Sequence, residues 1–299
     1  MEERKTIYLC LAHMSETGEE QKYVKEAFDT NWVVPLGPNV NGFEDDLKAF
    51  VSKNSDGSEL SREVVALSAG TAAVHLGLLA SGVGPGDEVC VQSFTFCASS
   101  HPITYLGATP VFIDSEPDSW NMDPELLEKA IIDRKEKTGK YPKAIVPVAL
   151  YGMPYDCDKI MAISEKYGIP VVEDAAEGCG SRWKGQVLGT FGKFGVLSFN
   201  GNKMITTSGG GALICQDAES KNNVMWYATQ ARDAYPYYQH TAIGYNYRLS
   251  NVCAGIGRGQ MTVLEDHIAH HKHVQELYKE LLKDVEGVTL HEAPNADYD

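Results

Sequence analysis

Short, continuous apolar runs recur from residue 64 onward and predict a sheet whose strands alternate mostly with helical or loop segments. The runs expected as strands are residues 64–68, 88–92, 110–114, 144–150, 170–174, 196–199 and 211–215. Runs with so few polar interruptions are typical of strands buried on both faces. We therefore expect an α/β fold with a mostly parallel, seven-stranded sheet covered by helices.

Apolar residues at helical spacing predict helices at both ends of the chain. Residues 17–20 have the form of a capping box and precede an apolar face within residues 23–28. A second helix is expected around residues 43–51, after a loop rich in proline and glycine. From residue 262 a long amphipathic helix is expected to run to about residue 284, and residues 288–290 look like a strand.

This change of pattern suggests a domain boundary. We expect a large domain over residues 1–261, and an interdomain helix with the start of a small domain over residues 262–299. A domain that stops so soon after a long helix looks incomplete.

The composition narrows the possible partners. A net charge of −15 disfavours nonspecific binding to nucleic acid or an anionic membrane, so we expect neither partner. The same charge means that a phosphorylated ligand must be held by local donors. The seven cysteines include no C-x-x-C pair, and no signal peptide or apolar run of membrane length is present. A cytoplasmic protein with reduced thiols is the best fit.

Two polar side chains at strand ends suggest a specific chemistry. Lys203 lies in a polar turn that follows an apolar strand, and Asp174 ends another strand about thirty residues upstream. A lysine that can form a Schiff base and a carboxylate that can hold a pyridinium nitrogen are what pyridoxal phosphate (PLP) chemistry requires. Taken singly, each residue is more simply a surface lysine or a strand-end acid.

A phosphate site is expected close by. Gly70 and Thr71 follow a strand and open a helix, where free N–H groups and the helix dipole favour an anion. Ser198, at the end of its own strand, would be a second donor. The alternative for residues 70 and 71 is an ordinary helix cap.

Three other positions complete the candidate chemistry. Phe96 would stack on a flat cofactor ring, or else pack in the core. Glu177 lies three residues after Asp174 and would touch the substrate or the ring's phenolic oxygen, unless it is a solvated acid at a helix start. His267, His270 and His271 share a helix face, but a solvated face is the default and we expect no metal site.

With these residues assembled, the chain resembles the sugar aminotransferases of the DegT/DnrJ/EryC1/StrS family, which are fold-type I PLP enzymes. The nearest resemblance is to the branch that aminates UDP-linked 4-keto-6-deoxy-N-acetylhexosamines for bacillosamine and exopolysaccharides. The stretches that carry the resemblance are residues 31–38, 92–96, 173–177, 198–211 and 246–251.

The resemblance implies a role for each matching position. Lys203 would bind PLP covalently and shuttle the proton, and Asp174 would pair with the pyridine nitrogen. Gly70, Thr71 and Ser198 would hold the phosphate, and Phe96 would stack on the ring. Asn246 would reach the phosphate in the neighbouring subunit of a homodimer. Substrate-lining residues would be Asn31, Trp32, Val33 and Val34.

The sequence thus predicts an aminotransferase that moves an amino group, with glutamate as donor, to a keto nucleotide sugar. A same-fold sugar dehydratase is an alternative, although Lys203 argues against it because those enzymes replace that lysine. The other alternative is a PLP-binding protein without turnover.

Overall fold

The computed structural model describes residue 6 and residues 11–299. All seven predicted strands are present: β1 (Glu63–Leu67), β2 (Glu88–Gln92), β3 (Thr109–Ile113), β4 (Ala144–Val146), β5 (Val172–Asp174), β8 (Phe194–Ser198) and β9 (Gly211–Cys215). A hairpin that the sequence did not reveal adds β6 (Arg182–Trp183) and β7 (Gln186–Val187).

The strands form one twisted array in the order 3-2-4-5-8-9-1. Ladders join β3-β2-β4 and β5-β8-β9-β1, and two parallel bridges, Ile145 to Val171 and Val148 to Asp174, connect the two groups. Every pair within this seven-stranded array is parallel except those of β9, which runs antiparallel to both β8 and β1. The largely parallel sheet is therefore confirmed.

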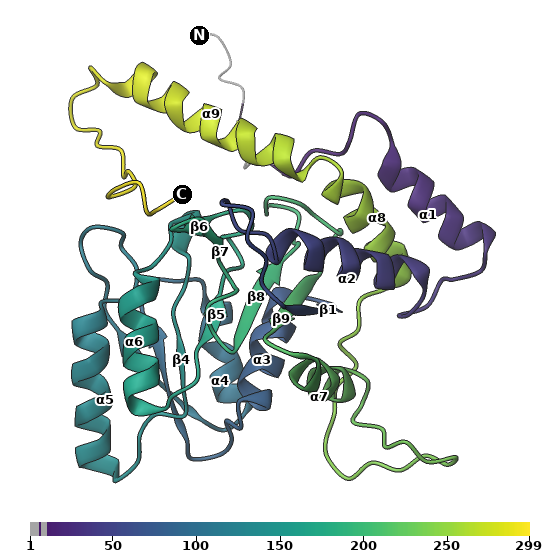
Figure 1. Ribbon diagram of the computed structural model, residues 1–299, viewed down its shortest axis with the longest axis horizontal. Helices are drawn as coiled ribbons and strands as arrows, with labels where there is room; N and C mark the ends of the chain where they lie inside the picture. The colour runs from purple at the N-terminus through teal and green to yellow at the C-terminus, as the bar shows by residue number, and fades with distance from the viewer. Residues whose placement is uncertain (1–5, 7–10) are drawn as a thin grey trace.

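Helices cover both faces of this sheet (Figure 1). In chain order they are α1 (Glu19–Asp29), α2 (Pro38–Val51), α3 (Gly70–Ala80), α4 (His101–Tyr105), α5 (Pro124–Thr138), α6 (Cys157–Tyr167), α7 (Ala218–Ala228), α8 (Asn251–Met261) and α9 (Leu264–Leu282). Two short 3-10 turns, η1 (Cys97–Ser99) and η2 (Leu150–Gly152), follow β2 and β4.

The hydrophobic core lies in two layers, one on each face of the sheet. Alternate residues of β1 belong to different layers: Val64 and Ala66 pack with α2, α5 and α6, whereas Val65 and Leu67 pack with α3, α4 and α7. Because side chains alternate across a strand, a strand covered on both sides is apolar throughout. This double burial explains the continuous apolar runs.

Three details of the sequence prediction are wrong. The capping box does not form, because α1 begins after Gly18 and Ser15 Oγ instead accepts the Glu19 N–H at 3.2 Å. Residues 288–290 are not a strand, since no neighbouring strand pairs with them. The strand expected over 144–150 ends at Val146, because Pro147 has no N–H to continue the ladder.

The last part of the chain runs alongside the large core without joining the main sheet. Helix α9 leads away from α8, and the following segment returns to β6, where Trp183 and Tyr298 form an antiparallel bridge (Figure 1). The division into residues 1–261 and 262–299 stays a prediction. Within the described part of the chain, no helix is both long and apolar enough to cross a bilayer.

Candidate active site

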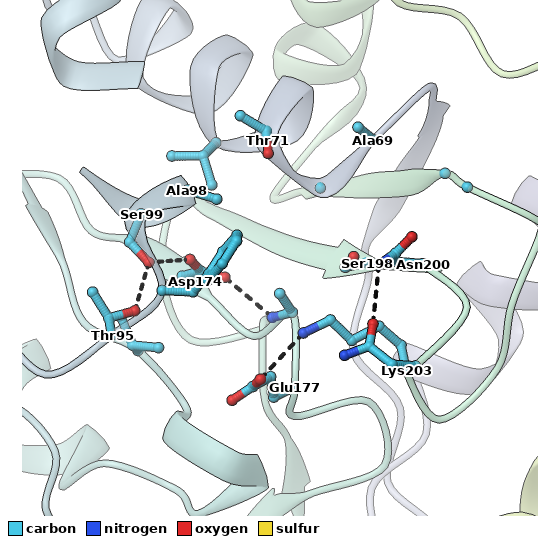
Figure 2. A pocket seen from close by; sticks show the side chains of 18 of the residues that line it. Ala69, Thr71, Thr95, Ala98, Ser99, Asp174, Glu177, Ser198, Asn200 and Lys203 are labelled. Atoms are coloured by element: carbon cyan, nitrogen blue, oxygen red, sulfur yellow. Dashed lines mark hydrogen bonds and ion pairs between the residues drawn. The ribbon is translucent and has the colours of Figure 1, made fainter. Parts of the chain in front are cut away.

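A cavity of about 380 Å³ lies at the carboxyl ends of β5 and β8 and at the N-terminus of α3 (Figure 2). In sheets of this type ligands bind outside the carboxyl ends of the strands. Seven of the predicted site residues line it: Gly70, Thr71, Phe96, Asp174, Glu177, Ser198 and Lys203.

Asp174 is the buried acid of the cavity. Its side chain is at the end of β5, only 5% exposed, and one carboxylate oxygen accepts the Ser99 hydroxyl at 2.6 Å. The other oxygen accepts the Ala176 N–H at 3.2 Å. Burial raises the pKa of Asp174, and the hydrogen bonds from Ser99 and Ala176 and the charge of Lys203 oppose that rise. The site thus holds a carboxylate that gains from a cationic partner in the cavity.

Lys203 enters the cavity from the turn after β8. The turn is closed by a hydrogen bond from the Lys203 N–H to the Asn200 carbonyl at 3.0 Å. The Lys203 Nζ lies 3.2 Å from Glu177 Oε1, and the lysine side chain is 17% exposed. Its amine is therefore close to a carboxylate partner and partly shielded from solvent, on the same side of the sheet as Asp174.

The N-terminus of α3 forms the third wall. Ala69 precedes the helix in an extended conformation, and no side chain caps the first turn. The ordinary-cap alternative is therefore wrong, and the first N–H groups of α3 are available to an anion. A Cβ on Gly70 would lie 3.0 Å from the Ser198 Cβ, so a side chain at this position would push the helix and the strand slightly apart.

Phe96 stands at the mouth of the cavity with 74% of its side chain exposed. The core-packing alternative is therefore wrong for this residue. A large exposed aromatic ring beside a polar cavity is available for stacking on a flat ligand.

Sequence reasoning missed several lining residues. The most informative is Ser99, which lies in η1 and contacts Asp174 across 75 positions of sequence. Thr95 Oγ1 lies 2.8 Å from Ser99 Oγ and extends this hydroxyl chain. Asn200 and Asn202 flank the lysine turn and were visible in the sequence, but no pattern there indicates that they line a cavity.

The remaining predicted residues lie away from this cavity. Asn246 is exposed and forms an antiparallel bridge with Thr229. An exposed loop contains Asn31, Trp32, Val33 and Val34. Asn251 Nδ2 fixes this loop by donating a hydrogen bond to the Trp32 carbonyl at 2.9 Å. Within one chain, these residues do not join the Lys203 cavity.

No metal site accompanies the cavity in the described residues, where no group of three histidine, cysteine, aspartate or glutamate side chains could hold an ion. On α9, His270 and His271 lie edge to face at 6.3 Å, and His267 Nδ1 lies 3.2 Å from the Met204 carbonyl oxygen.

The donor set of the cavity fits PLP. A buried acid suits a protonated ring nitrogen, an amine at the opposite wall suits an aldehyde carbon, and an uncapped helix N-terminus suits a phosphate. The approach of Gly70 to Ser198 leaves the backbone accessible where the phosphate would bind.

Comparison with known proteins agrees with this chemistry. The profile of the DegT/DnrJ/EryC1/StrS aminotransferase family matches residues 14–298. EpsN of Bacillus subtilis (strain 168), described as a pyridoxal phosphate-dependent aminotransferase, is 47% identical over 284 residues, which are 95% of this chain and 70% of EpsN. GDP-perosamine synthase of Escherichia coli O157:H7 is 36% identical over 272 residues, 91% of this chain and 71% of that enzyme.

Solved structures confirm the fold. A DegT/DnrJ/EryC1/StrS aminotransferase from Brucella abortus superposes with a TM-score of 0.86 at 31% identity, covering 94% of this chain and 72% of that one. The PLP form of the sugar aminotransferase Spr1654 from Streptococcus pneumoniae gives a TM-score of 0.80 at 26% identity, covering 92% and 71%. The predicted fold-type I architecture is thereby confirmed, and members of the family use PLP. This chain belongs to the DegT/DnrJ/EryC1/StrS aminotransferase family.

Proposed function

We propose that this protein transfers an amino group from glutamate to a keto group of a nucleotide-linked sugar, for surface polysaccharide or glycan synthesis. The observation that carries the proposal is the convergence of the Lys203 amine, the buried Asp174 carboxylate and the uncapped N-terminus of α3 in one cavity. The sugar aminotransferase relatives support the reaction type.

The acceptor we propose is a UDP-linked 4-keto-6-deoxy-N-acetylhexosamine. Its support is the resemblance of residues 31–38, 92–96 and 246–251 to that branch, together with the 47% identity to EpsN. Because the chain is also similar to GDP-perosamine synthase, a GDP-linked keto sugar is the alternative acceptor to test beside the UDP-linked one.

Each cavity residue has a proposed part in this reaction. PLP, when bound, supplies a ring that withdraws electrons from the substrate carbon that loses its proton. Lys203 would hold the cofactor covalently and would move the proton at the reacting carbon. Asp174 keeps the ring nitrogen protonated, because its buried carboxylate is stabilised by that positive charge.

The other residues of the cavity hold the cofactor and orient the lysine amine. The first N–H groups of α3, with the Thr71 and Ser198 hydroxyls, bind the phosphate. Phe96 covers one face of the ring. Glu177 lies 3.2 Å from the lysine amine and keeps that amine turned toward the cavity.

We further propose a homodimer in which Asn246 reaches the partner's cofactor phosphate and residues 31–34 line the partner's sugar pocket. Both segments are exposed in the single chain, as residues that serve a neighbouring site must be. A cytoplasmic location is proposed because the six cysteines in the described part of the chain are free thiols.

The test is a two-stage reaction of the PLP-loaded protein. Glutamate alone should convert the cofactor to its aminated form, which is seen as a change in the absorption spectrum. The UDP-linked 4-keto sugar should then restore the original spectrum and yield an aminosugar. Unchanged absorption with glutamate would favour a PLP-binding protein without turnover, and release of water from the sugar without amination would favour a dehydratase.

A further inference from the structure

Three exposed aromatic side chains lie on segments that adjoin the cavity. Phe94 is 45% exposed, Trp120 41% and Tyr151 75%. The Phe94 ring centroid lies 6.3 Å from that of Trp120 and 6.3 Å from that of Tyr151. We call Phe94, Trp120 and Tyr151 the aromatic shelf.

Two of these residues adopt a backbone conformation that aromatic residues rarely take. The φ angle is 64° at Trp120 and 55° at Tyr151, both in the left-handed region. Such strain in a bulky residue persists only where surrounding contacts enforce it, and it concentrates at functional sites. One face of the Trp120 ring stacks on His291, with ring centroids 3.9 Å apart, whereas Tyr151 is 75% exposed. Burial therefore does not offset the strain at Tyr151.

A pair of buried amides holds the three segments together. Gln92 and Asn121 are both completely buried, and Gln92 Nε2 donates to Asn121 Oδ1 at 3.1 Å. Gln92 Nε2 also donates to the Phe94 carbonyl at 2.9 Å. Asn121, the neighbour of Trp120, accepts the Leu150 N–H at 3.1 Å and donates to the Met153 carbonyl at 2.9 Å, on either side of Tyr151.

The shelf is also joined to the proposed reacting centre. The Tyr151 N–H donates to Glu177 Oε2 at 2.7 Å, while Glu177 Oε1 lies 3.2 Å from the Lys203 amine. Phe94 is followed directly by Thr95 and Phe96, which line the cavity. A ligand whose reacting carbon lies at Lys203 therefore has the shelf as its next neighbour on this side.

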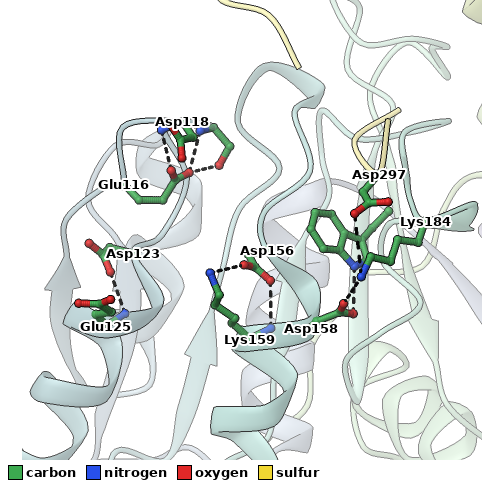
Figure 3. A network of polar contacts seen from close by, with 11 residues as sticks. Glu116, Asp118, Asp123, Glu125, Asp156, Asp158, Lys159, Lys184 and Asp297 are labelled. Atoms are coloured by element: carbon green, nitrogen blue, oxygen red, sulfur yellow. Dashed lines mark hydrogen bonds and ion pairs between the residues drawn. The ribbon is translucent and has the colours of Figure 1, made fainter. Parts of the chain in front are cut away.

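The chemistry of the shelf favours an uncharged ring. The rings carry no charge, and the adjoining loop is acidic, with Glu116 and Asp118 just before Trp120 (Figure 3). The Glu116 carboxylate already accepts the Asp118 N–H at 2.6 Å and the Ser119 N–H at 2.8 Å. A phosphate group would be repelled here, whereas the apolar C–H face of a sugar ring packs well on exposed aromatic rings.

We propose that the aromatic shelf binds the neutral sugar ring of the acceptor and thereby selects sugars over the smaller amino donor. This inference rests on the proposed function and deepens it. Glu177 acts as a positioning residue, because it fixes the Tyr151 backbone relative to the Lys203 amine.

The test compares two stable probes, UDP-N-acetylglucosamine and UDP, by titration calorimetry on the PLP-loaded protein. The wild-type protein should bind the sugar nucleotide more tightly than UDP. Tyr151→Asn removes the ring, and asparagine tolerates the left-handed backbone. This variant should weaken binding of UDP-N-acetylglucosamine about tenfold and leave the Kd for UDP unchanged.

Matched variants and a second readout complete the design. Tyr151→Phe keeps the ring and should bind both probes as the wild type does. Tyr141→Asn should do the same, because this exposed tyrosine lies just before β4, at the amino ends of the strands. The spectral reaction with glutamate should be unchanged in Tyr141→Asn. A wild-type protein that does not react with glutamate would contradict the proposed function, yet the two-probe comparison would still test the shelf.

Three results would overturn the proposal. Equal affinity of the wild-type protein for the two probes would mean that the sugar ring gains nothing from the shelf. Equal weakening of UDP and UDP-N-acetylglucosamine in Tyr151→Asn would assign the shelf to the base. A change of oligomeric size in that variant would identify the shelf as a contact between subunits.

Discussion

At the scale of single residues, the proposed chemistry depends on the buried carboxylate of Asp174. Its negative charge destabilises the folded protein as long as no cationic cofactor ring lies beside it. Asp174 is almost fully buried, and in the described part of the chain its carboxylate accepts hydrogen bonds from the neutral donors of Ser99 and Ala176. Lys203 has its own carboxylate partner in Glu177. The two residues are thus held ready by separate contacts rather than by pairing with each other.

Lys203→Ala should abolish covalent attachment of PLP and transamination, because the chain loses the amine at the strand-end turn. Borohydride reduction of the loaded wild type followed by peptide mapping should place the cofactor on Lys203. Lys193→Ala, at an exposed lysine just before β8, is the matched control and should keep full activity. Cofactor mapped to any other lysine contradicts the assignment.

Asp174→Asn should lower the transamination rate about a hundredfold while some cofactor stays bound, because an amide does not stabilise a protonated ring nitrogen. Asp114→Asn, at an exposed acid after β3, is the control for loss of one negative charge. Steady-state rates with glutamate measure the difference, and a near-normal rate in Asp174→Asn would remove the proposed role.

The same substitution should stabilise the cofactor-free protein. Burial raises the pKa of Asp174, so the folded chain keeps this proton to a higher pH than the unfolded chain does. The free energy of unfolding therefore falls as the pH rises from the unfolded-state pKa, about 3.9, through the raised value. Denaturant unfolding should be measured across this pH range. The free energy of unfolding of Asp174→Asn should exceed that of the wild type only at the upper end of the range.

At the scale of elements, β5 places two acids on opposite faces of the sheet. Asp174 faces the cavity, whereas the fully buried Glu173 accepts N–H groups of Gly189, Phe191 and Gly192 at 2.9, 2.6 and 2.5 Å. Alternation along a strand accounts for this division. Glu173 therefore fixes the segment that leads into β8 and, through β8, the Lys203 turn.

Glu173→Ala should destabilise the protein by about 3 kcal/mol or more, because two buried donors and one partly buried donor lose their acceptor. Glu173→Gln keeps the size and one acceptor oxygen, and should cost about 1–2 kcal/mol. Urea unfolding measures both, with Glu165→Gln at an exposed position of α6 as the control. An Ala variant as stable as the Gln variant would show that the backbone donors find other partners.

At the scale of the whole molecule, the homodimer that we propose would account for the exposure of Asn246 and of the loop at residues 31–34. Both lie outside the Lys203 cavity of their own chain. In Figure 1 the segment between α7 and α8 extends from the body of the molecule, and Asn246 is bridged to Thr229 at the base of that segment.

Asn246→Ala should weaken PLP retention about tenfold to a hundredfold, the cost of losing one hydrogen bond to a charged phosphate. Dilution of the wild type to monomer should have a similar effect. Cofactor occupancy measured against protein concentration tests both, and Asn223→Ala on α7 serves as the control. A monomer that holds PLP as tightly as the dimer would show that one chain builds the whole site.

The sequence by itself determined the seven strands, the parallel character of the sheet and the positions of Lys203 and Asp174 at strand ends. These features follow from hydrophobic periodicity and from the rule that ligands bind at the carboxyl ends of strands, both of which are local in the chain. The family resemblance added the proposed roles of Asn246 and of residues 31–34, which no local pattern indicates.

Only the tertiary structure decided how distant segments meet. Ser99 donates a hydrogen bond to Asp174, and Gln92 donates one to Asn121. Glu177 accepts hydrogen bonds from both Lys203 and Tyr151. Each of these contacts spans more than twenty residues of sequence. The antiparallel direction of β9 and the absence of a strand at residues 288–290 were also decided there. A strand forms only beside a partner, and a buried polar group is stable only where another segment supplies its hydrogen bond, so neither could be deduced from a local pattern.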